Sequence, residues 1–135
     1  MPIAKDLYGR IVAAKVFMDE NYQEPLNLEE ISRKAFLSRY HFHRLFSQVY
    51  KKTPHQYLTA RRMGKAMELL SQNKQVSEVC TEVGFESLGS FSVLFKKEIG
   101  FAPQYYRNMA WLKKQKSKEQ PRAVVPHCFL ENMDR

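Results

Sequence analysis

Cysteine, glycine and long apolar runs are all scarce in this chain of 135 residues. Its two cysteines, Cys80 and Cys128, match no metal-ligand spacing, and no HExxH motif or catalytic triad order occurs. The sequence therefore predicts no metal site, no cofactor and no enzyme active site. It also contains no run of about 18 apolar residues and no signal-peptide core at the N-terminus, so we expect neither a membrane span nor export. These absences favour a reduced, cytoplasmic protein.

The five glycines and six prolines lie mostly at the edges of segments, and no long stretch alternates apolar and polar residues. This pattern predicts an all-α fold. Apolar stripes at helical spacing and capping residues place helices at about residues 4–21, 28–35, 38–50, 53–71, 76–83, 87–99 and 102–114. Asn27 and Ser38 are the expected N-caps of the second and third helices, and Pro54 suits the first turn of the fourth.

An internal repeat relates residues 28–57 to residues 76–106. A short helix, a tight turn and a longer helix in each copy form the helix-turn-helix pattern. We divide the chain into a first helix-turn-helix subdomain at 1–52, a long linker helix at 53–72, a second subdomain at 73–114 and a flexible basic tail at 115–135. At an offset of 48, Leu28, Ile31, Ala35 and Leu37 match Val76, Val79, Val83 and Phe85, and at 49, Ser38, Phe42, Leu45, Phe46, Pro54 and Tyr57 match Ser87, Phe91, Leu94, Phe95, Pro103 and Tyr106.

The net charge is +8 and the isoelectric point is near 9.6, which suits a polyanionic partner. In the helix at 38–50, Phe42, Leu45, Phe46 and Val49 form one apolar stripe that we assign to the core. The opposite arc carries two guanidinium groups, a phenol and an imidazole, which can reach base edges in a major groove. The candidate DNA-binding residues of this first unit are Arg39, Tyr40, His43, Arg44 and Ser47.

The equivalent arc of the second unit has fewer hydrogen-bonding groups than the arc of the first unit, and it carries a single charge. Its candidates are Leu88, Gly89, Ser90, Ser92, Val93 and Lys96, which offer close backbone approach, hydroxyl groups and apolar contacts. We therefore expect unequal halves, in which the first unit reads bases and the second mainly positions the protein.

Phosphate contacts are expected from helix N-caps and nearby basic residues. Arg62 has a second interpretation, because its side chain could equally hold the long helix to a neighbouring element through an ion pair. The candidates are Ser38, Lys51, Lys52, Arg62, Ser87, Lys97 and Arg107.

Five segments in this order and spacing resemble the DNA-binding domain of the AraC/XylS family of bacterial transcription regulators. The resemblance covers roughly residues 8–107 and implies seven helices in two subdomains bridged by the long fourth helix. It further implies that two recognition helices enter successive major grooves about 34 Å apart. The segments are SRYHFHRLF at 38–46, RMGKAMELL at 62–70, VGFES at 83–87, FSVLFKK at 91–97 and GFAPQYYR at 100–107.

Residue by residue, the resemblance assigns DNA contacts to Tyr40, His43 and Arg44 in the first unit. In the second unit it assigns them to Leu88, Gly89, Ser90, Ser92 and Val93.

Two positions depart from the family pattern. Val93 stands where a basic residue is common, which weakens the expected readout by the second unit. Phe36 stands where the first turn usually has glycine, so either the turn differs or Phe36 packs and strain is accepted. The chain leaves no room for the effector domain of most family members, and we expect either a small stand-alone regulator or an isolated domain.

Together these features predict a sequence-specific transcription regulator that binds double-stranded DNA as a monomer. RNA polymerase is a second candidate partner. The alternative is a helical protein-interaction module whose contact with DNA is mainly nonspecific.

Overall fold

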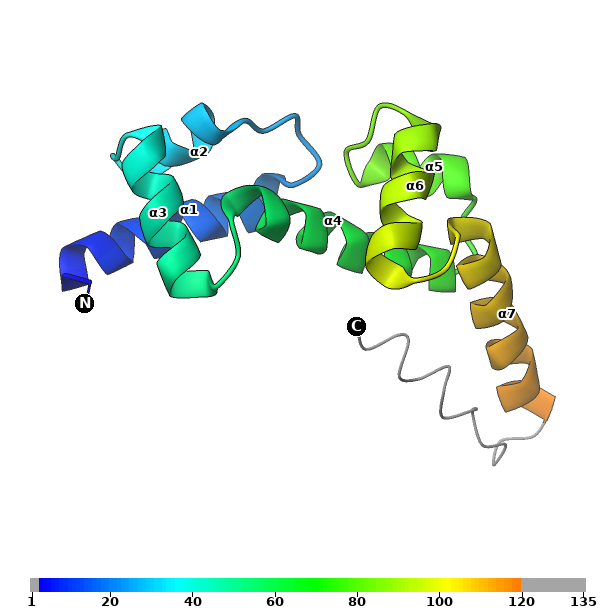
Figure 1. The fold of residues 1–135 in the computed structure, drawn as a ribbon. Helices are drawn as coiled ribbons and strands as arrows, with labels where there is room; N and C mark the ends of the chain where they lie inside the picture. The colour runs from blue at the N-terminus through cyan, green and yellow to red at the C-terminus, as the bar shows by residue number, and fades with distance from the viewer. Residues whose placement is uncertain (1–2, 120–135) are drawn as a thin grey trace. The chain divides into compact units, whose positions relative to one another are not determined.

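The computed structural model describes residues 3–119, which are helical throughout apart from the connecting turns and contain no strand (Figure 1). The all-α prediction is therefore confirmed, with the predicted helix boundaries correct to within a residue or two except at the last helix. The elements are α1 (Lys5–Asn21), α2 (Leu28–Lys34), α3 (Arg39–Tyr50), α4 (Pro54–Ser71), α5 (Val76–Glu82), α6 (Leu88–Ile99) and α7 (Pro103–Glu119).

The last helix continues past the predicted end at Lys114 as far as Glu119. The first residues of the segment predicted as a flexible tail are therefore helical, and the rest of that segment, 120–135, lies outside the described residues. None of the helices in the described part of the chain combines the length and the apolarity needed to cross a membrane.

The helix starts follow from local capping chemistry, as predicted. The Asn27 side chain accepts a hydrogen bond from the Glu30 N–H at 2.8 Å, and Ser38 Oγ accepts one from the His41 N–H at 3.2 Å. Ser87 Oγ repeats the Ser38 contact at the start of α6, with the Ser90 N–H at 3.3 Å. Each cap satisfies an amide that the helix itself leaves unpaired.

The chain divides into two compact units, Met1–Arg62 and Met63–Arg135. The boundary falls inside α4, the helix that we predicted as a linker. The first half of this helix contributes Leu58 to the core of the first unit, and the second half contributes Met63, Ala66, Leu69 and Leu70 to the core of the second. The long helix is therefore part of both folded units.

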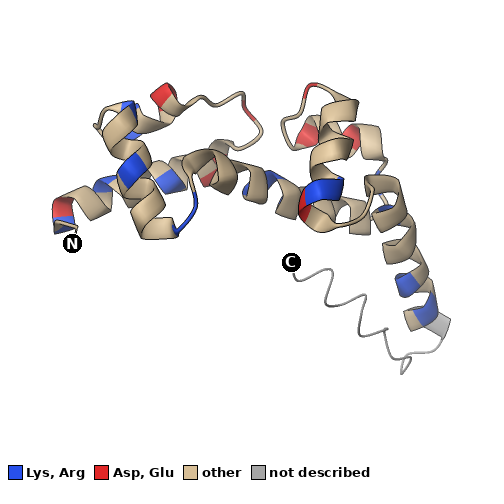
Figure 2. Ribbon diagram, in the orientation of Figure 1, with Lys and Arg blue, Asp and Glu red and all other residues tan. Residues whose placement is uncertain are grey.

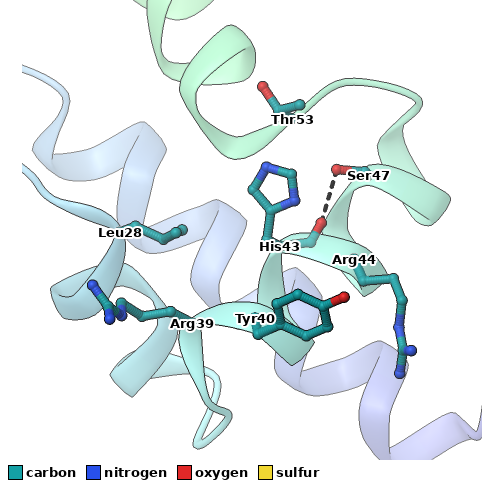
Figure 3. Close-up of a pocket in the computed structure, with 7 residues that line it drawn as sticks. All are labelled: Leu28, Arg39, Tyr40, His43, Arg44, Ser47 and Thr53. Atoms are coloured by element: carbon teal, nitrogen blue, oxygen red, sulfur yellow. Dashed lines mark hydrogen bonds between the residues drawn. The ribbon is translucent and has the colours of Figure 1, made fainter.

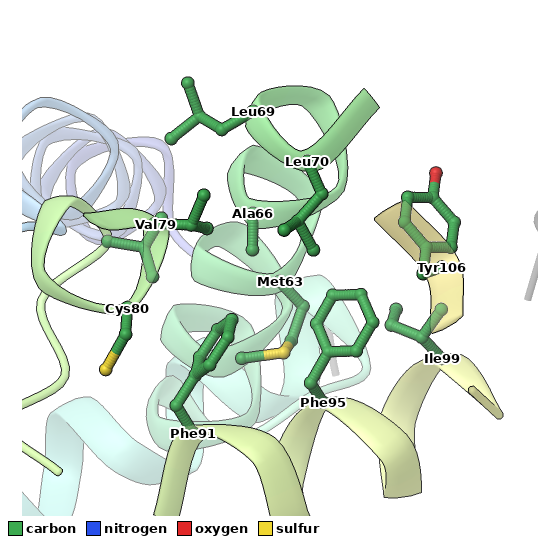
Figure 4. Close-up of a cluster of buried hydrophobic side chains, with 11 residues drawn as sticks. Met63, Ala66, Leu69, Leu70, Val79, Cys80, Phe91, Phe95, Ile99 and Tyr106 are labelled. Carbon is green, nitrogen blue, oxygen red and sulfur yellow. The ribbon is translucent and has the colours of Figure 1, made fainter. Parts of the chain in front are cut away.

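The predicted aromatic stripes are the centres of the two cores. Phe42 and Phe46 are fully buried in the first unit, with ring centroids 5.5 Å apart. Phe91 and Phe95 repeat this arrangement in the second unit at 5.7 Å, and Tyr106 packs edge-on against Phe95 (Figure 4). Burial of these large rings is the main favourable contribution to the stability of each unit.

The turn of each helix-turn-helix unit is a Schellman motif. In the first unit, the Leu37 and Phe36 amides donate to the carbonyls of Ser32 and Arg33, and Phe36 takes a left-handed φ of 56°. The usual turn is thus retained and its strain accepted. The expectation that Phe36 packs is wrong, because its side chain is 81% exposed.

The loop that precedes each helix-turn-helix unit is held by one arginine. Arg62 donates from Nε to the Tyr22 carbonyl at 2.8 Å and from Nη2 to the Glu24 carbonyl at 2.9 Å. Arg107 makes the matching pair with Lys74 at 2.8 Å and Asn73 at 3.0 Å. The second interpretation of Arg62 is therefore right in kind: its side chain holds a neighbouring segment, through hydrogen bonds to carbonyl oxygens.

Asp19 joins α1 to α4 in the first unit. It accepts a hydrogen bond from the Tyr57 hydroxyl at 2.7 Å and pairs with Lys15 at 2.9 Å and Arg61 at 3.7 Å. Burial of the ring and the hydrogen bond to Asp19 raise the pKa of Tyr57 to about 12. These contacts fix the helix that carries Thr53 and Pro54 at its start.

Candidate nucleic-acid interface

The exposed arc of α3 carries the five residues predicted to contact DNA in the first unit. Arg39, Tyr40, His43 and Arg44 are exposed and Ser47 is half-buried, and Figure 3 shows their side chains extending from the same helix. Tyr40 is 81% exposed, although a phenol ring normally gains by burial. The helical period that buries Phe42 and Phe46 is what turns these groups outward.

An open groove of about 780 Å³ runs along this arc. All five predicted residues line it, so the structure brings the candidates of the first unit together (Figure 3). Leu28 and Thr53 line it too and were missed by the sequence interpretation. Both lie at the starts of neighbouring helices, as the caps at Asn27 and Thr53 indicate, but nothing in the sequence shows that these helix starts approach α3.

Thr53 is held in place by a reciprocal capping box. Its hydroxyl accepts a hydrogen bond from the Gln56 N–H at 3.1 Å, while the Gln56 side chain accepts one from the Thr53 N–H at 3.0 Å. This contact fixes the edge of the groove next to Lys51 and Lys52.

The Ser47 hydroxyl is already engaged within the helix. It donates to the carbonyl of His43 at 2.8 Å, one turn earlier (Figure 3). A hydroxyl has one proton to donate, so Ser47 faces the groove as an acceptor.

The electrostatic character of α3 is uniformly positive. The helix contains Arg39 and Arg44 and no acidic residue, and Lys51 and Lys52 follow it in the turn to α4 (Figure 2). Both lysines are exposed. Such a cationic surface next to hydrogen-bonding side chains suits a phosphate backbone flanking readable bases.

The corresponding arc of α6 has a different chemistry on the same scaffold. Leu88 and Val93 are 49% and 73% exposed, and Gly89 and Ser90 lie between them, also exposed. Ser92 is half-buried, and Lys96 and Lys97 are exposed toward the helix C-terminus. The structure thus places all six candidates of the second unit on α6, with the positive charge confined to one end.

The phosphate-contact candidates fall into three groups. Lys51, Lys52 and Lys97 are exposed, as is Lys96, which belongs to the candidate arc of α6. Ser38 and Ser87 cap helices with their hydroxyl oxygens, as described above. Arg62 and Arg107 spend two guanidinium donors each on carbonyl oxygens, and burial lowers the pKa of Arg62. The fold therefore already accounts for these two arginines.

Within residues 3–119, no group of three or more His, Cys, Asp or Glu side chains could hold a metal ion. Cys80 is buried in the second core, and this burial raises the pKa of its thiol. A buried, protonated thiol is a small apolar group in chemical terms. Cys128 lies outside the described residues.

Comparison with known proteins places this geometry in context. Residues 31–109 match the sequence profile of a helix-turn-helix domain. The Transposon Tn10 TetD protein of Escherichia coli is 34% identical over 98 residues, which cover 71% of this chain and 71% of TetD. A probable transcriptional regulator, LumQ of Photobacterium leiognathi, is 33% identical over 92 residues, which cover 67% of this chain and 37% of LumQ.

Solved structures share the fold. A transcriptional regulator from Chromobacterium violaceum, described as containing an AraC-type DNA-binding domain, is 27% identical with a TM-score of 0.70, covering 76% of this chain and 93% of its own. The DNA-binding domain of AdpA, solved in complex with a target DNA, has the same TM-score of 0.70 at 24% identity, covering 84% and 98%. The chain spans about a third of the length of the first curated relatives it matches, between 31% and 37%.

Proposed function

This chain belongs to the AraC-type family of helix-turn-helix transcription regulators, and we propose on that premise that it binds a specific, asymmetric duplex site. In this proposal α3 and α6 enter two successive major grooves, about one helical turn apart. The first unit supplies most of the base readout, and the second mainly sets the register.

The observation that carries the proposal is the exposed arc of α3. Arg39 and Arg44 extend from one face into open solvent, beside His43 and Tyr40, with no acidic residue on the helix. Arginine can donate two parallel hydrogen bonds to O6 and N7 of guanine, a pattern that other bases do not present. These two arginines, with the imidazole and the phenol beside them, give α3 four exposed side chains that can form hydrogen bonds with bases.

Phosphate contacts in this proposal come from both units. Lys51, Lys52, Lys96 and Lys97 supply charge, and the caps Ser38 and Ser87 lie where the recognition helices begin. We leave Arg62 and Arg107 out of this set, because their donors already bind carbonyl oxygens of the protein.

The partner is double-stranded DNA, and the proposed binding unit is a monomer. A regulator with one reading helix per chain needs a dimer to span two half-sites, whereas this chain carries two reading helices. The AdpA domain, which has the same fold, was solved with a target DNA, and this supports the choice of partner.

Selection from a pool of random duplexes tests the proposal. We expect one asymmetric motif, and Arg44→Ala should weaken binding to it by about 1–3 kcal/mol and relax the preference at one base pair. Arg33→Ala is the matched control, because Arg33 is an exposed arginine outside the groove that pairs with Glu29. If no motif is enriched, the protein-interaction module is the better reading of this surface.

A further inference from the structure

The face of α6 carries apolar side chains at the positions where α3 carries arginines. The repeat aligns Leu88 with Arg39 and Val93 with Arg44, because both recognition helices begin at an equivalent serine cap. Between these two positions the face has small side chains or none, at Gly89, Ser90 and Ser92, and Lys96 follows one turn after Val93. Leu88 and Val93 are therefore the two apolar groups that protrude from it.

Folding does not account for these two apolar groups. Leu88 is 49% exposed and Val93 is 73% exposed, and neither belongs to the second core or to the residues packed against it. A single exposed aliphatic side chain is ordinary on any protein surface. Two of them at the positions that bear guanidinium groups in the sister unit form a pattern that the core does not need.

We propose that α6 reads thymine, through contact of Leu88 and Val93 with the C5-methyl groups of an A·T-rich second half-site. This inference rests on the proposed function, because it requires α6 to lie in a major groove. The thymine methyl is the apolar group on the major-groove edges of the four bases. Removing it and an aliphatic side chain from water together is favourable, whereas neither side chain can pair with guanine.

Gly89 supports close approach of this face to the bases. A Cβ added at Gly89 would lie 3.7 Å from Ser87 Oγ, an ordinary contact distance, and the residue has no left-handed φ. The fold itself therefore accepts alanine at this position. What the missing side chain provides is a low surface between two protruding apolar groups, which lets the helix backbone come near the DNA.

The two units would then use opposite chemistry on one scaffold. Hydrogen bonds from Arg39 and Arg44 select guanine in one half-site, and apolar contacts from Leu88 and Val93 select thymine in the other. Lys96 and Lys97, at the far end of α6, supply phosphate contacts that tolerate any sequence.

Deoxyuridine substitution tests this directly, because it removes the thymine methyl and leaves every hydrogen-bonding group in place. The motif from the random-duplex selection is first divided, with the half that Arg44→Ala relaxes assigned to α3. In the other half, replacing a contacted thymine with deoxyuridine should weaken binding by about threefold to tenfold. The same replacement in the α3 half should have a smaller effect.

Variants make the test specific to the side chain. Val93→Ser should bind the thymine site about threefold to tenfold more weakly and should lose its sensitivity to deoxyuridine at one position. Val16→Ser is the matched control, since Val16 is an exposed valine on α1, and it should keep the full sensitivity. Gly89→Ala should keep the helical circular dichroism of the native protein and bind more weakly.

The outcomes separate the two proposals. If a motif is enriched and Arg44→Ala weakens binding, but deoxyuridine in the second half-site changes nothing, thymine reading by α6 is overturned and the proposed function stands. An equal loss with deoxyuridine in Val93→Ser and in the native protein overturns the role of Val93. If no motif is enriched at all, the proposed function fails and this inference fails with it.

Discussion

Phe36 and Gly84 take the same left-handed backbone conformation at the same position of the two helix-turn-helix turns, with φ of 56° and 95°. Glycine reaches this region without steric cost, whereas a residue with a Cβ meets its own carbonyl oxygen there. The first turn therefore stores strain that the second does not. The Phe36 side chain recovers little of it, because it is exposed.

Replacing Phe36 with glycine should stabilise the first unit. Relief of the left-handed strain, about 1–2 kcal/mol, outweighs the extra freedom that glycine gives the unfolded chain, about 0.4–1 kcal/mol. We expect a net gain of about 0.5–1 kcal/mol in urea unfolding. Gly84→Ala is the reciprocal control and should destabilise. A lower unfolding free energy for Phe36→Gly would show that the ring makes a contact worth more than the strain.

Arg62 should behave as a stabilising residue and not as a phosphate contact. Its two hydrogen bonds to the carbonyls of Tyr22 and Glu24 need a planar fork, which lysine lacks. Arg62→Lys should lower the free energy of unfolding by about 2 kcal/mol. Arg62→Gln, which removes the charge as well, should leave the salt dependence of DNA binding unchanged. Arg44→Lys, at an exposed position, should change stability by less than about 0.5 kcal/mol. A reduced salt slope for Arg62→Gln would restore the phosphate assignment.

Burial of Tyr57 and its hydrogen bond to Asp19 should make the stability of the first unit sensitive to alkaline pH. The pKa of Tyr57 is about 12 in the folded protein and about 10 in an unfolded chain. A pKa raised on folding gives a stability contribution that is complete below about pH 10 and is lost between about pH 10 and 12. Tyr57→Phe lacks this contribution at every pH.

The measurement is the difference in unfolding free energy between the native protein and Tyr57→Phe from pH 8 to pH 11.5. At pH 8 the variant should be less stable by about 1 kcal/mol, the usual loss for one hydrogen bond. This deficit should shrink as the pH rises above 10. Burial also raises the pKa of Tyr50 and Tyr106, but both are present in the two proteins, so their effects cancel. A constant deficit would mean that Tyr57 ionises normally in the folded state.

Local chemistry explains why much of the fold could be predicted. The caps at Asn27, Ser38 and Ser87 each act within three residues of the chain, and the apolar stripes act within one helix. The internal repeat also helped, because a helix or turn identified in one unit predicts the same element at the aligned position of the other. The end of α7 was missed because the residues after Lys114 are polar and basic. A helical segment without apolar residues gives no periodic signal in the sequence.

Long-range contacts explain what could not be predicted. Arg62 binds carbonyls 38 and 40 residues away, and no pattern in the sequence marks a carbonyl as a partner. The same holds for Leu28 and Thr53, which join the groove because α2 and α4 start beside α3. At Phe36 the residue type predicted against a left-handed backbone conformation, because a side chain with a Cβ disfavours it. The two Schellman hydrogen bonds of the turn nevertheless hold Phe36 in that conformation.

The salt dependence of DNA binding tests the cationic turn between α3 and α4. Each phosphate contact releases condensed counterions, so losing one lysine contact should lower the salt slope by about 1 and weaken all sequences about equally. Lys52→Gln removes the charge alone. Lys51 is the C-cap of α3 and has a left-handed φ of 60°. Lys51→Gln removes its charge and keeps the backbone strain, whereas Lys51→Gly would change both, so glutamine is the better substitution. The control is Lys65→Gln on α4, where Lys65 already pairs with Glu68. An unchanged slope for both turn variants would move the phosphate backbone away from this turn, and the orientation proposed for α3 in the groove would have to change with it.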